Sequence, residues 1–197
     1  MRRLLVVLGL LLAGCTATEP GSPTAGDQPS ETNTTATEAP TTTTTTAAKR
    51  PKNIDMAAVD VCKVLSALPL ATYGLDTDRP PLGGESDVFP GSKDCFANGL
   101  QSRLGLTLVA VVDQGAPEYA DGANAQVKVD RTDVDGFALY VLTPPDPNSC
   151  FGVLDVNDGQ MLDINYGIVS SGSQPATPQA TLCQRVPEIA KAALAQL

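Results

Sequence analysis

The sequence predicts an α+β domain in residues 53–197, built on an antiparallel sheet of about five to six strands. Three observations support this fold class: a helical spacing of apolar residues near both ends of the region, strand-like segments between them, and four cysteines that can form two disulfides. Helices that flank a run of antiparallel strands usually cover one face of the sheet. We therefore expect the N-terminal and C-terminal helices to pack on the same face.

The two helices are predicted from apolar residues that recur at spacings of three and four. The first pattern covers residues 54–68, but Asp60 is also a suitable N-cap for a helix that starts directly after it. Pro69 ends or bends this helix. The last pattern covers residues 178–197, where Pro187 predicts a kink or a restart because proline cannot donate a backbone hydrogen bond.

The segments between the helices read mainly as strands. Residues 104–112 are the most strand-like and are apolar on both faces, so we expect them at the centre of the sheet. A tight hairpin is predicted at Asp158-Gly159, and one turn of helix near residues 117–120. Residues 76–91 are expected to be a long loop. A loop that takes part in binding and a loop without a function are equally consistent with this sequence. The other expected strands are 95–97, 127–129, 137–142, 150–156 and 161–166.

The N-terminus has the features of an export signal. Arg2 and Arg3 precede an apolar run at residues 4–12 that is too short to cross a bilayer of roughly 30 Å. Small residues then precede Cys15, and this arrangement resembles the lipobox of bacterial lipoproteins. We expect residues 1–14 to be a signal peptide and Cys15 to be the lipid attachment site, which places the domain at the extracytoplasmic face of the cell membrane. The alternatives are an ordinary secretory signal or a buried N-terminal helix.

Residues 15–52 are expected to be a disordered tether. Thr, Ala, Pro, Ser, Gly and Glu dominate this segment, and almost no large apolar residue is available to build a core. A flexible coil of about 35 residues spans about 33 Å, and a polyproline-like one on the order of 110 Å. A bare spacer and an O-glycosylated stalk are equally consistent with the composition.

The charge and the missing residue types exclude several functions. The formal charge is −9, and removal of Arg2 and Arg3 with the signal peptide leaves 11 basic against 22 acidic residues. Such an acidic surface repels nucleic acids and anionic headgroups, so we expect no nucleic-acid partner and a membrane contact through the lipid alone. The chain has no histidine, which removes the usual general base and the commonest metal ligand.

The cysteines are expected to be oxidised. Cys62, Cys95, Cys150 and Cys183 make an even number in an exported chain, which allows three connectivities. Both sequential pairs are separated by 33 residues, and we favour these pairs, Cys62 with Cys95 and Cys150 with Cys183. A metal site or free thiols are the alternatives, but none of the four cysteines lies in a Cys-x-x-Cys motif.

The domain carries a set of short motifs: Asp60-x-Cys62, Asp94-Cys95, Val134-x-Gly136, the Cys150 strand with its Asp-Gly hairpin, and Cys183 before an Ala-Leu helix. Together with the leader and the tether, these motifs resemble a family of actinobacterial lipoproteins that is defined by a domain of unknown function and includes the mycobacterial proteins LprB and LprC. The resemblance covers residues 54–197, and it implies surface display without an established activity. Where members of that family often have tryptophan after the second domain cysteine, this chain has Phe96 and Asn98.

No catalytic, metal or cofactor site is predicted. Asp130, Asp133 and Asp135 are the nearest approach to a calcium loop, but Arg131 occupies the first ligand position and Leu142 replaces the closing glutamate. We expect a noncatalytic binding or accessory module whose partner is an envelope protein or a small ligand. The alternatives are a hydrolase that uses two carboxylates and a purely structural stalked protein. The sequence leaves the oligomeric state open.

Overall fold

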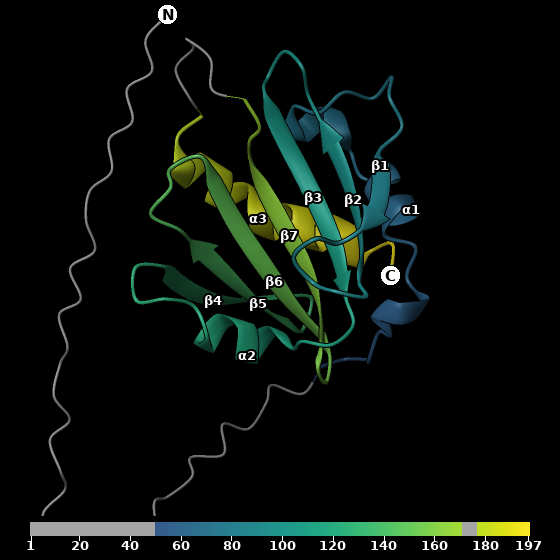
Figure 1. The fold of residues 1–197 in the computed structure, drawn as a ribbon, viewed down its shortest axis with the longest axis vertical. Helices are drawn as coiled ribbons and strands as arrows, with labels where there is room; N and C mark the ends of the chain where they lie inside the picture. Colours follow the sequence, from purple (N-terminus) through teal and green to yellow (C-terminus); the bar gives the residue numbers. More distant parts are fainter. Residues whose placement is uncertain (1–49, 171–176) are drawn as a thin grey trace, which may run out of the picture. The chain divides into compact units, whose positions relative to one another are not determined.

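The computed structural model describes residues 50–170 and 177–197 (Figure 1). The chain divides into two units, Met1–Thr44 and Thr45–Leu197, and the second unit holds every helix and strand described below. The predicted signal peptide, the predicted lipid attachment site Cys15 and nearly all of the predicted tether lie outside the described residues.

Seven antiparallel strands form one sheet in the order β1-β2-β3-β7-β6-β5-β4. The α+β class is confirmed, but the expected number of about five to six strands is wrong. The additional strand is β1, inside the segment that we expected to be a loop. Its sequence, Leu-Gly-Gly-Glu, has no strand periodicity, so pairing with β2 decides its conformation. The strands are β1 (Leu82–Glu85), β2 (Lys93–Asn98), β3 (Leu104–Val111), β4 (Lys128–Val134), β5 (Phe137–Thr143), β6 (Ser149–Asn157) and β7 (Gln160–Ile168).

The centre of the sheet is β7, with β3 on one side of it and β6 on the other. We expected β3 at the centre because it is apolar on both faces. β3 lies one position away from the centre instead. Its sequence is apolar on both faces because a strand next to the centre is also covered on both faces. At one edge, β4 is longer than expected and six of its seven residues are exposed, which explains why a polar sequence forms it.

Tight turns close two of the hairpins, β4–β5 and β6–β7. In the turn between β4 and β5, Asp135 and Gly136 have φ angles of 50° and 87°, the left-handed conformation that a two-residue hairpin turn needs. The predicted Asp158-Gly159 hairpin between β6 and β7 is confirmed. There only Gly159 has a positive φ, and an irregularity in register lies between Asp155 and Asn157.

The first α-helix, α1 (Val61–Ser66), starts at the later of the two expected positions. The carboxylate of Asp60 accepts a hydrogen bond from the backbone N–H of Lys63, which caps the helix. A 3₁₀ turn, η1 (Met56–Ala58), takes the place of the earlier start. A second 3₁₀ turn, η2 (Leu70–Tyr73), follows Pro69.

The last helix, α3 (Gln179–Leu194), continues through Pro187, so the expected restart does not occur. The proline removes one hydrogen bond, whereas the buried residues Val186, Ile189 and Ala190 hold the helix against the sheet. A short helix, α2 (Ala116–Asp121), confirms the turn of helix predicted at residues 117–120.

The helices lie on both faces of the sheet. Because successive strand residues point to opposite faces, Leu154 and Leu162 pack with α1 and α3, whereas Val153 and Met161 pack in a second cluster with α2. The expectation that the N-terminal and C-terminal helices share a face is therefore confirmed. Figure 1 shows α3 crossing behind the sheet in the view given.

Both favoured disulfides form. Cys62 on α1 is bonded to Cys95 on β2, and Cys150 on β6 is bonded to Cys183 on α3, each with Cα atoms 5.1 Å apart. Each bridge joins a helix to the sheet. The first also explains Gly83 on β1, where a Cβ would lie 2.5 Å from the sulfur of Cys62.

The described part of the domain begins with a contact that the sequence analysis did not predict. Arg50, which we assigned to the tether, makes an ion pair with Asp155 on β6 and another with Asp158 in the β6–β7 turn. Its side chain is only 11% exposed. None of the helices in residues 50–170 and 177–197 is long and apolar enough to cross a membrane.

Candidate functional site

The face of the sheet opposite α1 and α3 is only partly covered, and it holds the candidate site. The strand register aligns Phe96, Thr107, Asn165 and Phe151 in one row across β2, β3, β7 and β6. All four side chains are half-buried. This row is therefore accessible from solvent, whereas the row next to it lies deeper.

Asp163 on β7 lies in that deeper row, between Val109 on β3 and Val153 on β6. The residue is 6% exposed, and its Oδ1 atom has no hydrogen-bond partner in the described part of the chain. Burial among apolar side chains raises the pKa of Asp163 to about 7. A buried carboxyl group without a partner is costly, and such groups are concentrated at functional sites.

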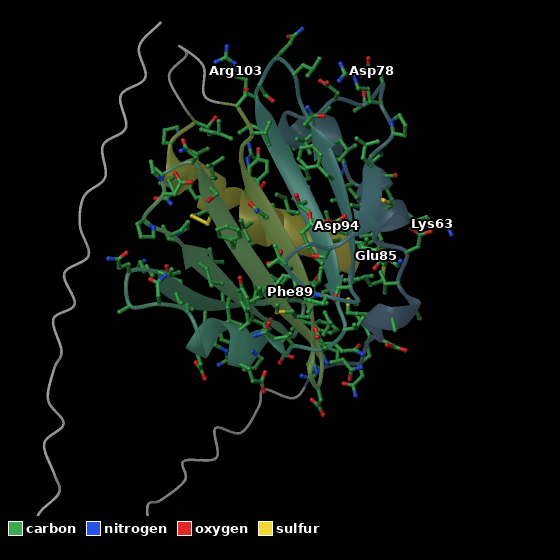
Figure 2. The ribbon with its side chains drawn as sticks, viewed as in Figure 1. Lys63, Asp78, Glu85, Phe89, Asp94 and Arg103 are labelled. Atoms are coloured by element: carbon green, nitrogen blue, oxygen red, sulfur yellow. A yellow bond between two sulfur atoms is a disulfide. The ribbon has the colours of Figure 1, made fainter. Side chains whose placement is uncertain are left out.

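Two aromatic rings pack in the apolar cluster that surrounds Asp163. Phe89 comes from the segment between β1 and β2, Tyr119 comes from α2, and their ring centroids are 5.6 Å apart. Figure 2 labels Phe89 on the near side of the sheet, away from α3. Burial, and secondarily the charge of Asp163, raises the pKa of Tyr119.

The backbone around Phe89 is held in place by a buried serine. The hydroxyl of Ser86 accepts hydrogen bonds from the backbone N–H groups of Val88 and Phe89 at 3.3 and 3.2 Å. This arrangement is a side-chain-supported turn of the kind that fixes short loops. These hydrogen bonds fix the backbone that places the buried ring of Phe89 in this cluster.

A pocket of about 320 Å³ opens between α2 and strands β5 and β6. Its walls are apolar and aromatic, and two side-chain amides, Gln114 and Asn124, supply polar groups. None of its lining residues is basic. This composition is typical of sites for small, partly apolar ligands. The lining residues are Gln114, Tyr119, Gly122, Ala123, Asn124, Val127, Leu142 and Phe151.

A second hollow, of about 230 Å³, lies near the β1 edge of the sheet. It is bordered by Asp76, Arg79 and Pro80 from the segment before β1, and by Leu82 and Phe96 from the sheet. Part of the segment that we expected to be a 76–91 loop therefore forms the wall of a groove, and part forms β1. Leu82 is 71% exposed beside it.

Asp155 is the other buried carboxyl group on the sheet, and its setting differs from that of Asp163. Its Oδ1 atom accepts a hydrogen bond of 2.6 Å from Arg50. Burial raises the pKa of Asp155, although the neighbouring guanidinium of Arg50 opposes the shift. The carboxylate of Asp155 is therefore already paired with Arg50 within the domain.

The carboxylates that resemble a calcium loop are used within the fold. Asp130 pairs with Lys128, Asp133 accepts a hydrogen bond from the backbone of Gly136 at 2.8 Å, and Asp135 pairs with Lys191. Across residues 50–170 and 177–197, no group of three or more Cys, Asp or Glu side chains is arranged to hold a metal ion.

Of the predicted site residues, Cys62, Cys95, Cys150 and Cys183 form the two separate disulfides, and Cys15 lies outside the described residues. Sequence reasoning missed Asp163. The only signal for it is one acidic residue inside the otherwise apolar segment Met161-Leu162-Asp163-Ile164. That signal is weak, because a strand at the surface carries a carboxylate just as readily.

The comparisons with known proteins identify the family. The model of a family described as "Protein of unknown function (DUF3558)" matches residues 10–196. The chain belongs to this family. Its membership confirms the resemblance to a family defined by a domain of unknown function, and the matched region includes Cys15 and the threonine-rich segment as well as the domain. No curated protein and no solved structure matches the chain.

Proposed function

We propose that this DUF3558 protein is a lipoprotein, anchored through Cys15 at the extracytoplasmic face of the cell membrane, and that its domain is a noncatalytic binding module. The basic and apolar leader before Cys15 supports the anchor, as does the polar segment that follows. Two disulfides in the domain fit an oxidising compartment outside the cytoplasm.

The observation that carries the binding function is the pocket beside α2. It combines the aromatic walls of Tyr119 and Phe151 with the amides of Gln114 and Asn124, on the face that α1 and α3 leave open. Asp163 supports this proposal, since a buried carboxyl group in the same apolar layer disfavours an anionic ligand. The ligand class that fits is a small neutral or cationic molecule with an apolar part.

A hydrolase that uses two carboxylates is less well supported. Glycosidic hydrolysis needs two carboxyl groups on opposite sides of one bond, about 5 to 10 Å apart. The two buried candidates are Asp155, which is bound by Arg50, and Asp163, which lacks a hydrogen-bonded partner at Oδ1. Neither lines the pocket beside α2. A purely structural stalk is the other alternative, and it would leave that pocket without a role.

The anchor is tested by the substitution Cys15→Ala in the full-length chain expressed in its native host. We expect the domain to leave the membrane fraction and to keep its two disulfides, because the acyl chains alone supply the attachment. Thr16→Ala is the control and should stay in the membrane fraction. Retention of Cys15→Ala in that fraction would contradict the lipid anchor.

The binding site is tested by nuclear magnetic resonance with a library of aromatic amines and neutral aromatic amides. We expect a subset to shift the amide signals of residues 119–127 and of Phe151. Ala123→Leu fills the pocket and should abolish these shifts, whereas Ala125→Leu, which lies exposed in the same loop and does not line the pocket, should preserve them. Binding that survives Ala123→Leu, or no shift at millimolar fragment, would overturn the proposed site.

A further inference from the structure

The two edges of the sheet differ in how well they are protected. An unpaired edge strand exposes backbone N–H and C=O groups that can pair with another chain, and charged side chains normally block such pairing. Edge strand β4 carries four of them: Lys128, Asp130, Arg131 and Asp133. Edge strand β1 has Glu85 alone, next to two glycines, and all four of its residues are exposed.

Two residues of β1 direct their backbone N–H and C=O groups away from the sheet. The N–H of Ser86 donates to the carbonyl of Ser92 on the β2 side at 2.9 Å, so the backbone N–H of Ser86 points into the sheet, toward β2. Along an antiparallel edge strand, successive residues direct their backbone N–H and C=O groups alternately into the sheet and away from it. The backbone groups of Gly84 and Leu82 therefore point toward β2 as well. The N–H and C=O groups of Gly83 and Glu85 point away from the sheet, where no described strand pairs with them.

A pocket of about 500 Å³ adjoins this edge. Residues Val59–Cys62 before and within α1 form one side, and Gly83–Glu85 with Lys93 and Asp94 form the other. Two of its carboxylates already have partners, since Lys63 pairs with Asp60 and Lys93 pairs with Glu85. Asp94 makes no ion pair with any residue of the described ranges. Figure 2 labels Glu85 and Asp94 on the neighbouring strands β1 and β2.

Because Gly84 has no side chain, the carboxylate of Asp94 stays accessible from the outer edge of β1. The two residues are register partners, and a Cβ at Gly84 would lie 3.6 Å from Oδ1 of Asp94, which is an ordinary contact. Gly83 is required by the disulfide beside it, but no steric reason within the domain requires glycine at position 84. A larger side chain there would stand between Asp94 and anything that pairs with β1.

From these observations we infer that β1 binds an extended peptide segment of another protein, which pairs with Gly83 and Glu85 and places a basic side chain across Gly84 onto Asp94. Strand addition of this kind uses main-chain hydrogen bonds for affinity and pockets for specificity. At the other end of β1, Leu82, Pro80 and Phe96 border the apolar hollow that receives a neighbouring side chain. A second copy of this chain fits less well, because like-charged pockets would meet.

The probe is an acetylated, amidated heptapeptide, Thr-Val-Thr-Lys-Thr-Val-Thr, with versions that carry Gln or Glu at the centre. It is titrated into the disulfide-bonded domain of residues 50–197 and followed by nuclear magnetic resonance. We expect the amide signals of Gly83 and Glu85 to shift, and the Lys peptide to bind at least about tenfold more tightly than the Glu peptide. No shift at Gly83 or Glu85 at millimolar peptide would overturn the inference.

Three variants separate backbone pairing from charge. Glu85→Pro removes an outward N–H and no hydrogen bond within the sheet, so binding should weaken at least about tenfold with little change in the thermal midpoint. Glu85→Ala keeps that N–H and should bind within about threefold of the native domain. Asp94→Asn should reduce the preference for Lys over Gln to less than about threefold.

The outcomes distinguish this inference from other readings of the edge. Equal binding by Glu85→Pro and Glu85→Ala would show that the peptide does not pair with the strand. Equal binding of the three peptides would refute the role of Asp94. A dimer at high protein concentration that Glu85→Pro abolishes would assign the edge to a second copy. None of these results depends on the pocket beside α2, so either proposal can fail alone.

Discussion

The guanidinium of Arg50 lies 2.6 Å from the carboxylate of Asp155, and this contact joins the first described residue to strand β6. The two side chains are 11% and 5% exposed. A threonine-rich segment precedes Arg50 in the sequence, and the ion pair shows that Arg50 belongs to the domain although we assigned it to the tether. It also neutralises a carboxylate that the sheet has buried.

Loss of this contact should destabilise the domain in a pH-dependent way. We expect Arg50→Ala to lower the free energy of unfolding at pH 7 by about 2 kcal/mol, because Asp155 is left buried and unpaired. The difference should shrink as the pH falls through the raised pKa of Asp155, since the protonated acid no longer attracts Arg50. Urea unfolding at several pH values measures both effects, and Lys52→Ala, at an exposed position, is the control. An effect that does not vary with pH would contradict an ionic role.

The buried acid Asp163 should make stability fall as the pH rises. Its folded pKa of about 7 exceeds the ordinary value of 3.8, so the folded state holds the proton more tightly than the unfolded state. The associated stabilisation is complete below about pH 4 and is lost as the pH rises to about 7, by up to about 4 kcal/mol. We expect Asp163→Asn to lack this decline and to be more stable than the native domain at pH 8. Parallel stability curves for the two proteins would contradict a raised pKa for Asp163.

Close packing of α3 on the sheet should make Gly152 intolerant of a side chain. A Cβ at this position would lie 2.3 Å from Cγ1 of Val186. We expect Gly152→Ala to cost about 1 to 3 kcal/mol of unfolding free energy, although alanine favours strand structure more than glycine does. Gly84→Ala, with its nearest contact at 3.6 Å, should change stability by less than about 0.5 kcal/mol. Equal effects at the two positions would contradict the close approach of the helix.

The two disulfides should contribute equally to stability. Each closes a loop with a sequence separation of 33 residues, and the chain-entropy model gives about 4 kcal/mol for a loop of this length. We expect the double variants Cys62→Ala/Cys95→Ala and Cys150→Ala/Cys183→Ala to lose similar unfolding free energy in urea. A difference larger than about 1 kcal/mol would mean that interactions in the folded state, and not the loop alone, set the contribution.

Local patterns predicted much of the fold because they report local physics. The spacing of apolar residues predicted α1 and α3, Asp60 marked one of the two starts expected for α1, and the Asp158-Gly159 pair located the last hairpin. Equal separations favoured the disulfide pairing that forms. β1 could not be predicted, since its Leu-Gly-Gly-Glu sequence has no preference for a strand and pairing with β2 alone makes it one.

The sequence by itself determined the α+β class and the exclusion of histidine chemistry, and it favoured the cysteine pairing that forms, because periodicity, composition and cysteine spacing are properties of the chain. Only the tertiary structure decided that Asp163 is buried, that Arg50 belongs to the domain and that β1 is an open edge. Each of these depends on residues far apart in sequence: Asp163 lies between strands β3 and β6, and Arg50 reaches a carboxylate 105 residues away. Burial and pairing arise from such neighbours, and no local pattern records them.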